Sequence, residues 1–245
     1  MVENILNNLG SVFLGRTTLQ MRGEIGGTRS VFVPYQGIKN DLIFPTTGGV
    51  VKNPFKTSGK MYAGDLVEFR FNGNKVANKY EQAEVLLLKT FEAQAAISST
   101  TLYIVRDGFR HKPEVGNVIM KAPDTLTGTG TAVTVNAVEA TKNGTDNVWK
   151  LTLSATIEGV VKGDILVEAT EAGSDKTMLV QNPNAILPCD YDFKYPPASG
   201  DDDYDNARYY LTPALHGTAF TYLMSPLPAA VKALNKSRIE GYFQI

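Results

Sequence analysis

The sequence predicts a mainly β protein, an antiparallel β-barrel or sandwich with an extended N-terminal arm and a short C-terminal helix. Thr, Val, Tyr and Phe suit strands and are plentiful, while 22 Gly and 12 Pro among 245 residues provide frequent turns. Several segments alternate apolar and polar residues, as half-buried strands do. A third observation is a short pattern that occurs three times, in which Gly and then Asp or Asn precede an aliphatic run.

Residues 1–60 are predicted to form the extended arm. This segment is crowded with Gly, Pro, Asn and Thr, and its apolar clusters are short. It can bury little against itself, yet side chains such as Phe32 and Tyr35 are too apolar for a free linker. An arm that lies on another protein surface accounts for both properties. The alternative is an irregular N-terminal part of the same domain.

The charge is distributed unevenly along a chain whose net charge is −1. Residues 1–60 carry seven basic and three acidic groups (+4), residues 61–185 carry twelve and fifteen (−3), and residues 186–245 carry five and seven (−2). The arm is therefore suited to an acidic partner surface, with Arg16, Arg22 and Arg29 as its candidate anchors.

Residues 61–185 are predicted to form the β core. In LVEFRF (66–71), Leu and Glu alternate with Val and Phe, and an Asn-Gly turn follows. The segment 79–96 fits either a helical stripe or a buried strand, and flanking strands favour a strand over 85–92. A further strand is expected in 101–110, ending in an Arg-Asp-Gly turn.

The clearest local prediction is a hairpin. A strand over 131–138 leads through TKNGTD (141–146), where Asn143-Gly144 supplies the turn chemistry, into a strand over 148–157. In that second strand Trp149 begins an apolar face that alternates with Lys, Thr and Ser.

Residues 186–245 change in character. The stretch from 182 to 210 is rich in Pro and Asp and is expected to form a long loop packed on the core. PLPAAVKALNK (226–236) places apolar residues at helical spacing, with Pro228 suited to a first helical turn. The last residues, RIEGYFQI, are expected to form a strand or a docked tail.

The threefold pattern occurs in YAGDLVEFRF (62–71), PEVGNVIMKA (113–122) and VKGDILVEAT (161–170). The residues between the copies do not align, so they are not the repeats of a solenoid or propeller. No Gly-x-x-x-x-Gly-Lys-Ser/Thr phosphate loop is present, and TLTGTGTAV (125–133) lacks the lysine. The pattern predicts a turn in which Gly supplies the backbone conformation and Asp or Asn bonds a nearby N–H group before a strand begins.

No residues are assigned to catalysis, to a cofactor or to a metal. Cys189 is the single cysteine, and neither His111 nor His216 has metal-ligand spacing. The acidic run 201–205 resembles the start of a calcium loop but lacks the Gly and Glu that complete one, and is interpreted as solvated. The chain is therefore expected not to be an enzyme and to need no cofactor.

Nucleic-acid and membrane partners are not expected. A small basic cluster of Arg106, Arg110, His111 and Lys112 follows a strand, but it does not alternate with a series of aromatic residues, so it is interpreted as a solvated or interface edge. No apolar run is long enough to span a bilayer, and the first residues do not have the pattern of a secretory signal.

The segment LLLKTFEAQAAISSTTLYIVRDGFRHKPEVGNVIMKAP (86–123), with YAGDLVEFR before it and KGDILVEA after it, resembles auxiliary, or decoration, capsid proteins of tailed bacteriophages, with a likeness to the crAss-like group. The resemblance covers roughly residues 60–170. It implies a β-rich domain on the outer surface of the phage head that contacts major capsid protein subunits, and a protein made in the host cytoplasm. The family has no catalytic residues to transfer.

The expected function is thus that of a structural virion protein that reinforces the capsid. Its expected partners are the major capsid protein, further copies of itself in the lattice, and a head fibre. The interaction residues predicted in the arm are Arg16, Arg22, Arg29, Phe32 and Tyr35. Two alternatives stay open: a head-fibre base, neck or tail component, and a carbohydrate- or cell-surface-binding β module.

Overall fold

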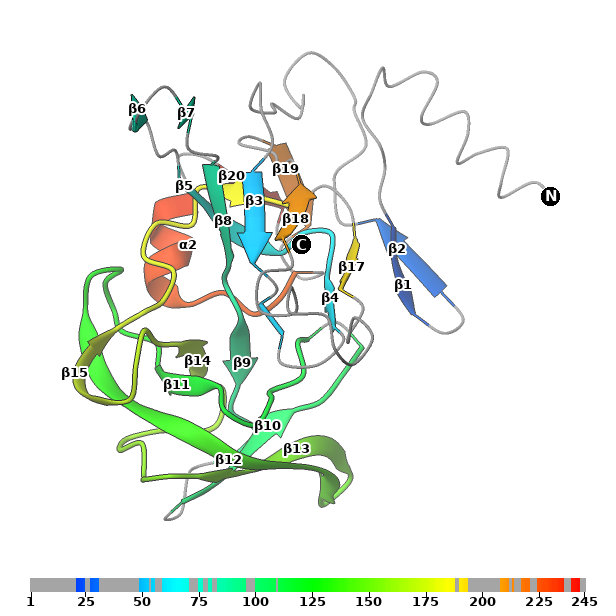
Figure 1. Ribbon diagram of the computed structural model, residues 1–245. Coiled ribbons are helices and arrows are strands. Elements are labelled where there is room, and N and C mark those ends of the chain that lie inside the picture. Colours follow the sequence, from blue (N-terminus) through cyan, green and yellow to red (C-terminus); the bar gives the residue numbers. More distant parts are fainter. Residues whose placement is uncertain are drawn as a thin grey trace, which may run out of the picture.

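The computed structural model describes residues 21–24, 27–30, 49–52, 54–55, 59–70, 75–76, 79–80, 83–95, 100–108, 110–187, 190–193, 208–211, 213, 217–220, 224–235 and 239–242. Within these ranges the protein is mainly β, with largely antiparallel sheets and one short helix near the C-terminal end (Figure 1). The predicted fold class is confirmed.

The larger sheet has seven strands and is strongly curled (Figure 1). Its order is β10 (Thr101–Val105), β13 (Asp146–Leu153), β12 (Thr129–Asn143), β11 (Val118–Lys121), β14 (Ile165–Glu168) and β9 (Thr90–Glu92), with β15 (Gly173–Thr177) paired to β12. The two ends of this order meet at one antiparallel bridge between Ala93 and Ile104. The sheet therefore curls like a barrel, but its end strands share a single bridge and not a full ladder.

A second sheet of five strands lies beside the first. Its order is β16 (Ala185–Ile186), β5 (Leu66–Arg70), β8 (Ala83–Leu87), β3 (Gly49–Lys52) and β18 (Arg208–Leu211). The β3–β8 pair is parallel and the other pairs are antiparallel. This sheet takes strands from each of the three predicted segments, because β3 belongs to residues 1–60 and β18 to residues 186–245.

Four further strand pairs and the helix complete the described chain. The pairs are β1 (Met21–Glu24) with β2 (Gly27–Ser30), β4 (Gly59–Met61) with β17 (Tyr191–Phe193), β6 (Lys75–Val76) with β7 (Lys79–Tyr80), and β19 (Gly217–Phe220) with β20 (Ile239–Tyr242). β16 and β17 lie within residues 182–210, which were expected to form a loop, and β18 begins there, so that prediction is wrong where the structure describes these strands. The expected terminal strand is confirmed as β20.

The chain passes from one sheet to the other between β8 and β9. The strand prediction for 85–92 is confirmed against the helical alternative, but the strand is interrupted at Leu88 and Lys89. β8 pairs with β5 in the five-stranded sheet, and β9 pairs with β14 in the curled sheet. The two residues between β8 and β9 therefore mark the junction of the two sheets.

The three Gly-Asp segments form the same turn, as predicted. Gly64, Gly116 and Gly163 have φ values of 87°, 86° and 89°. In each turn, the Asp or Asn after the Gly has its N–H bonded to the carbonyl three residues earlier, and its side-chain oxygen accepts the N–H of that same earlier residue. Positive φ at the third turn position is the geometry of a type II turn, which favours Gly.

Each of these turns leads into a strand and is tied to a neighbouring segment. The Gly N–H groups donate to the carbonyls of Leu187, Val135 and Ala93, each at 2.8 Å, and the strands that follow are β5, β11 and β14. The pattern is therefore a common way of starting a strand in this protein.

Replacing Gly163 with Ala is expected to lower the free energy of unfolding by about 1–2 kcal/mol, because Ala is strained at positive φ. No atom lies within 4 Å of the position of an added Cβ, so the loss would come from the backbone alone. Urea denaturation measures it, and Gly163→Asn should lose less because Asn tolerates positive φ. Equal stability of wild type and the Ala variant would contradict this conformational role.

The predicted hairpin is confirmed, with two differences in detail. The strands β12 and β13 pair up to Asn143 and Asp146, so the central turn residues are Gly144 and Thr145. Gly144 has a φ of 63°, which suits the first central position of a type II′ turn. β13 ends at Leu153, and the expected alternation therefore does not extend to residue 157.

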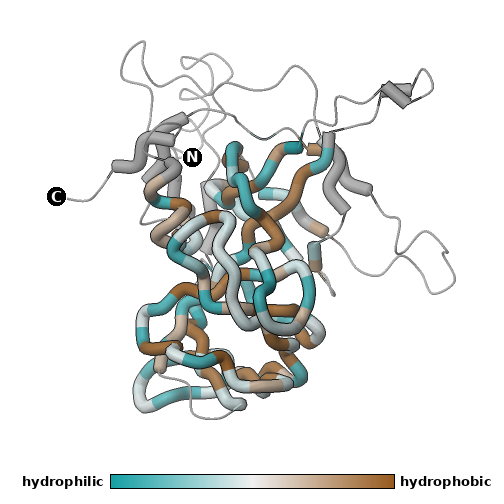
Figure 2. The backbone as a smooth tube through the Cα atoms, turned by 90° about the vertical axis from the view of Figure 1, so that its left-hand side faces the viewer, coloured by the Kyte–Doolittle hydropathy of each residue, from teal (hydrophilic) through white to brown (hydrophobic). Residues whose placement is uncertain are grey.

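Three apolar clusters hold the sheets together. One fills the interior of the curled sheet and includes Phe91 and Leu151, and a second lies against the five-stranded sheet around Phe69. The third joins the two sheets, because it contains Leu66 of β5 together with Met120 of β11. Hydrophobic stretches, in brown, recur along the chain of both parts in Figure 2.

The predicted helix is confirmed as α2 (Ala229–Asn235). Ala230 and Val231 are buried, and Val231 belongs to the cluster that joins the two sheets. The Pro228 carbonyl accepts the N–H groups of Val231 and Lys232, so Pro228 precedes the first helical turn rather than lying in it. The helix thus packs against the apolar cluster at the junction between the two sheets.

Glu68 attaches the segment before β16 to β5. Its carboxylate accepts hydrogen bonds from Arg70 Nε at 2.7 Å and from the backbone N–H groups of Gln181 and Asn182. Burial alone would raise the pKa of Glu68, but these bonds outweigh burial and hold the pKa below its usual value of 4.5. The ionised form is therefore the one that the fold stabilises.

Candidate functional site

A buried ionic cluster occupies the junction where the two sheets meet. At its centre is Lys89, from the break between β8 and β9, with a side chain that is 0% exposed. Its Nζ atom lies 3.3 Å from Glu168 Oε1 and 3.7 Å from Glu114 Oε2. It also donates a hydrogen bond to the Pro54 carbonyl and lies 4.9 Å from the centre of the Phe55 ring. Lys89 thus contacts three segments that are distant from it in sequence.

Asp65 is the second centre of this cluster and is also fully buried. Its Oδ2 atom accepts the Tyr62 N–H at 2.6 Å and lies 2.8 Å from His111 Nε2, while its Oδ1 atom accepts the Ser225 hydroxyl at 3.0 Å. The Asp65 carboxylate therefore connects the turn before β5, the loop before β11 and the segment before α2.

The rings around His111 complete its packing. The His111 ring lies 5.9 Å from Phe55 and 5.3 Å from Tyr62, measured between ring centroids. His111 is 2% exposed. The histidine that the sequence offered only as a member of a basic surface cluster is thus an interior residue.

Glu168 forms the outer side of the cluster. Burial raises the pKa of Glu168 above its usual 4.5, and the nearby Lys89 charge only partly offsets this effect. A cleft of about 260 Å³ opens beside it and is lined by Pro54, Asn117 and Glu168, among others. The Glu168 side chain is 13% exposed, against 7% for Glu114 and 0% for Lys89.

The order of the groups determines what the cluster can do. A nucleophilic triad needs a histidine hydrogen-bonded directly to the serine hydroxyl. Here Asp65 lies between Ser225 and His111, so the hydroxyl bonds to a carboxylate that also holds the histidine. The arrangement provides hydrogen bonds and ion pairs across the junction and does not activate Ser225 as a nucleophile.

No metal site accompanies this cluster within the described residues. Among the residues that the structure describes, no group of three or more His, Cys, Asp or Glu side chains is placed to hold a metal ion. No helix within the described ranges is long and apolar enough to cross a membrane. Cys189, His216 and the acidic run 201–205 lie outside the described residues.

The predicted interaction residues of the arm are only partly described. Arg22 and Arg29 lie directly opposite each other in the β1–β2 pair, so the structure brings these two together. Arg16, Phe32 and Tyr35 lie outside the described residues.

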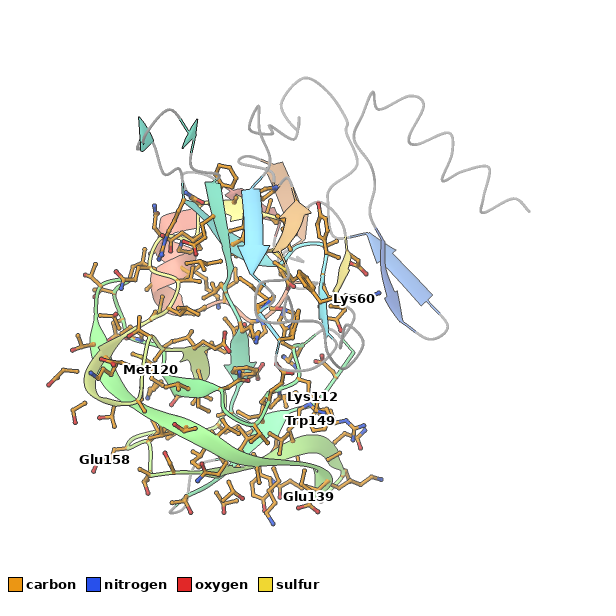
Figure 3. The ribbon with its side chains drawn as sticks, in the orientation of Figure 1. Lys60, Lys112, Met120, Glu139, Trp149 and Glu158 are labelled. Atoms are coloured by element: carbon orange, nitrogen blue, oxygen red, sulfur yellow. The ribbon has the colours of Figure 1, made fainter. Side chains whose placement is uncertain are left out.

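The residues of the predicted basic cluster, in the connection between β10 and β11, make three different kinds of contact. Arg110 pairs with Asp107 and with Glu92, while His111 turns inward to Asp65. Arg106 and Lys112 stay exposed and lie over Trp149 of β13, at 4.6 Å and 5.4 Å from the ring centroid. Figure 3 shows Lys112 close to Trp149. An aromatic side chain therefore does accompany these cations, although it comes from a strand about 40 residues away in sequence.

Trp149 also bears on the carbohydrate-binding alternative. A sugar-binding platform presents an open aromatic face. The Trp149 ring is half-buried against the interior of the curled sheet, and two cations lie over it. This arrangement favours a charged partner over a sugar ring.

Sequence reasoning missed Lys89, Asp65, Glu114 and Ser225 as members of one site. One signal was present, because Lys89 is the single charge within the apolar run VLLLKTF (85–91). A charge that interrupts a buried strand requires a partner, but the sequence does not indicate which of 25 acidic side chains provides it. Comparison with protein-family models, with curated proteins and with solved structures gives no match for this chain.

Proposed function

We propose that this protein is a non-enzymatic structural component of a tailed-phage virion, an auxiliary (decoration) protein that binds major capsid protein subunits on the outer surface of the head. Its resemblance to such proteins over roughly residues 60–170 suggests the class. The mainly β fold is compatible with it.

The observation that carries the proposal is how the interior ionisable groups are used. Lys89, Asp65 and His111 are each no more than 2% exposed, and each contacts groups from distant segments of the chain. Groups of these types serve catalysis when they reach a substrate. Here they join the N-terminal segment, both sheets and the segment before α2. These contacts stabilise the fold, which supports a structural protein whose function is to bind other proteins.

Co-sedimentation tests the proposal. Heads purified from the phage that encodes this chain, stripped of it or assembled without it, should bind the recombinant protein at a saturating, stoichiometric ratio. An N-terminal deletion should stop at residue 48, since β3, β4 and Pro54 take part in the fold. This deletion removes the predicted contact residues Arg16, Arg22, Arg29, Phe32 and Tyr35 and is expected to weaken head binding through the loss of those contacts.

The controls separate the role of the arm in head binding from the decoration role of the whole chain. Unfolding midpoints of the full and shortened chains show whether the deletion disturbs the fold. Full-strength binding by the shortened chain would assign the contact to the β core instead of the arm. Absence of binding by the full chain to heads that lack it would overturn the decoration role.

A further inference from the structure

We propose that Arg106, Lys112 and Trp149 form a docking site for the carboxylates of an acidic segment of a partner protein. We call these three residues the cation–tryptophan site. It does not depend on the virion role proposed above, although an acidic capsid exterior would be one surface of suitable chemistry. The arm residues predicted from sequence are not part of it.

The first support is that the two cations form no ion pair with described residues. Within the described part of the chain, neither Arg106 nor Lys112 takes part in an ion pair, and both side chains are exposed. The nearby carboxylates are already engaged, because Asp107 and Glu92 both pair with Arg110. Two positive charges beside one tryptophan ring, neither with an ion-pair partner among the described residues, leave hydrogen-bond donors for a negative group from outside.

The second support is that the two cations are held in place. Both lie over the ring of Trp149, which is itself packed against the interior of the curled sheet. The connection that carries them is anchored between them, since Arg110 is paired to Glu92 and His111 is bonded to buried Asp65. Long side chains normally lose conformational freedom when they bind a partner, and a fixed position reduces that cost.

The charge pattern favours a protein carboxylate over a nucleic acid. Binding along a nucleic-acid backbone requires an extended basic track, and here two cations stand beside the Arg110–Asp107–Glu92 group, which contains two acids. Both cations lie close to the Trp149 ring, so a base that stacked on it would have to compete with them. A short acidic peptide segment needs only a local pair of positive charges.

The chain provides its own reporter, because Trp149 is the only tryptophan. Intrinsic fluorescence excited at the indole therefore reports on this site alone. Titration of the full-length protein with a deca-glutamate peptide at low salt should change the Trp149 emission in a saturable way. Added salt should reverse the change, because the contacts are charged.

The variant Arg106→Gln/Lys112→Gln should weaken peptide binding about 10-fold or more, since it removes both donors of charge-assisted hydrogen bonds. Lys232→Gln is the matched control, because it removes an exposed charge on α2, in the other part of the molecule (Figure 1). It should bind like the wild type. Calorimetric titration repeats the comparison without relying on the fluorescence, and unfolding midpoints show that both variants are folded.

Three results would overturn the proposal: no saturable binding of deca-glutamate, equal binding by the double variant and the wild type, or binding of a dT10 oligonucleotide with no binding of the peptide. The last result would assign the site to single-stranded nucleic acid. Head binding is measured separately, so a virion role could fail while peptide binding holds, and the reverse.

Discussion

Replacing Lys89 with Met is expected to lower the free energy of unfolding by about 3–5 kcal/mol, the loss typical of breaking a buried ion pair from one side. Met fills a similar volume but cannot neutralise Glu168 and Glu114, whose carboxylates lie 3.3 Å and 3.7 Å from Lys89 Nζ. It also leaves the Pro54 carbonyl without its lysine donor. Urea denaturation followed by circular dichroism measures the difference.

Two comparisons make this expectation specific to the ionic cluster. Lys162→Met changes an exposed lysine in the same way and should shift the unfolding free energy by no more than about 0.5 kcal/mol. Adding Glu168→Gln to the Lys89 variant should recover part of the loss, because one unpaired carboxylate is removed. If the Lys89 variant matched the wild type in stability, the cluster would not hold the sheets together.

Replacing Asp65 with Ala is expected to lower the free energy of unfolding by about 3 kcal/mol or more, because buried donors lose their acceptor. The Ser225 hydroxyl, the Tyr62 N–H and His111 Nε2 all lie within 3.0 Å of the Asp65 carboxylate. Asp65→Asn keeps one oxygen and should lose less. Thermal and urea unfolding of both variants show which of them loses more stability.

Asp124 provides the matched control for Asp65. It is exposed, and its replacement with Ala should change the stability by no more than about 0.5 kcal/mol. Ser225→Ala removes one partner alone and should lose about 1 kcal/mol. A ranking in which Asp65→Ala is no worse than Ser225→Ala would show that the carboxylate is not the centre of these contacts.

Local features were the ones that could be predicted from sequence. The type II turns at Gly64, Gly116 and Gly163 follow from residues four apart at most, since Gly permits positive φ and the next side chain bonds within the turn. The β12–β13 hairpin and α2 follow similarly from their own periodicity. The errors in these elements were small shifts at their ends, where propensity is weakest.

The joining of the sheets could not be predicted, because it depends on pairings between distant residues. β5 is paired with β16, which is more than 110 residues later in the chain, and β3 is paired with β18 at a still greater separation. The segment 79–96 was ambiguous for the same reason. Its periodicity alone fits a helix or a strand, and only the two neighbouring sheets decide that it forms β8 and β9 with a break between them.

The sequence by itself determined the β class, the turns that start three strands and the chemistry available to the chain, because these depend on residue type and short spacing. Tertiary structure alone decided the roles of the charged residues. His111 and Lys112 are adjacent in sequence, yet one is buried against Asp65 and the other lies exposed over Trp149. Burial and partners decide whether such a residue stabilises the fold or remains available for binding, and only the packed chain supplies both.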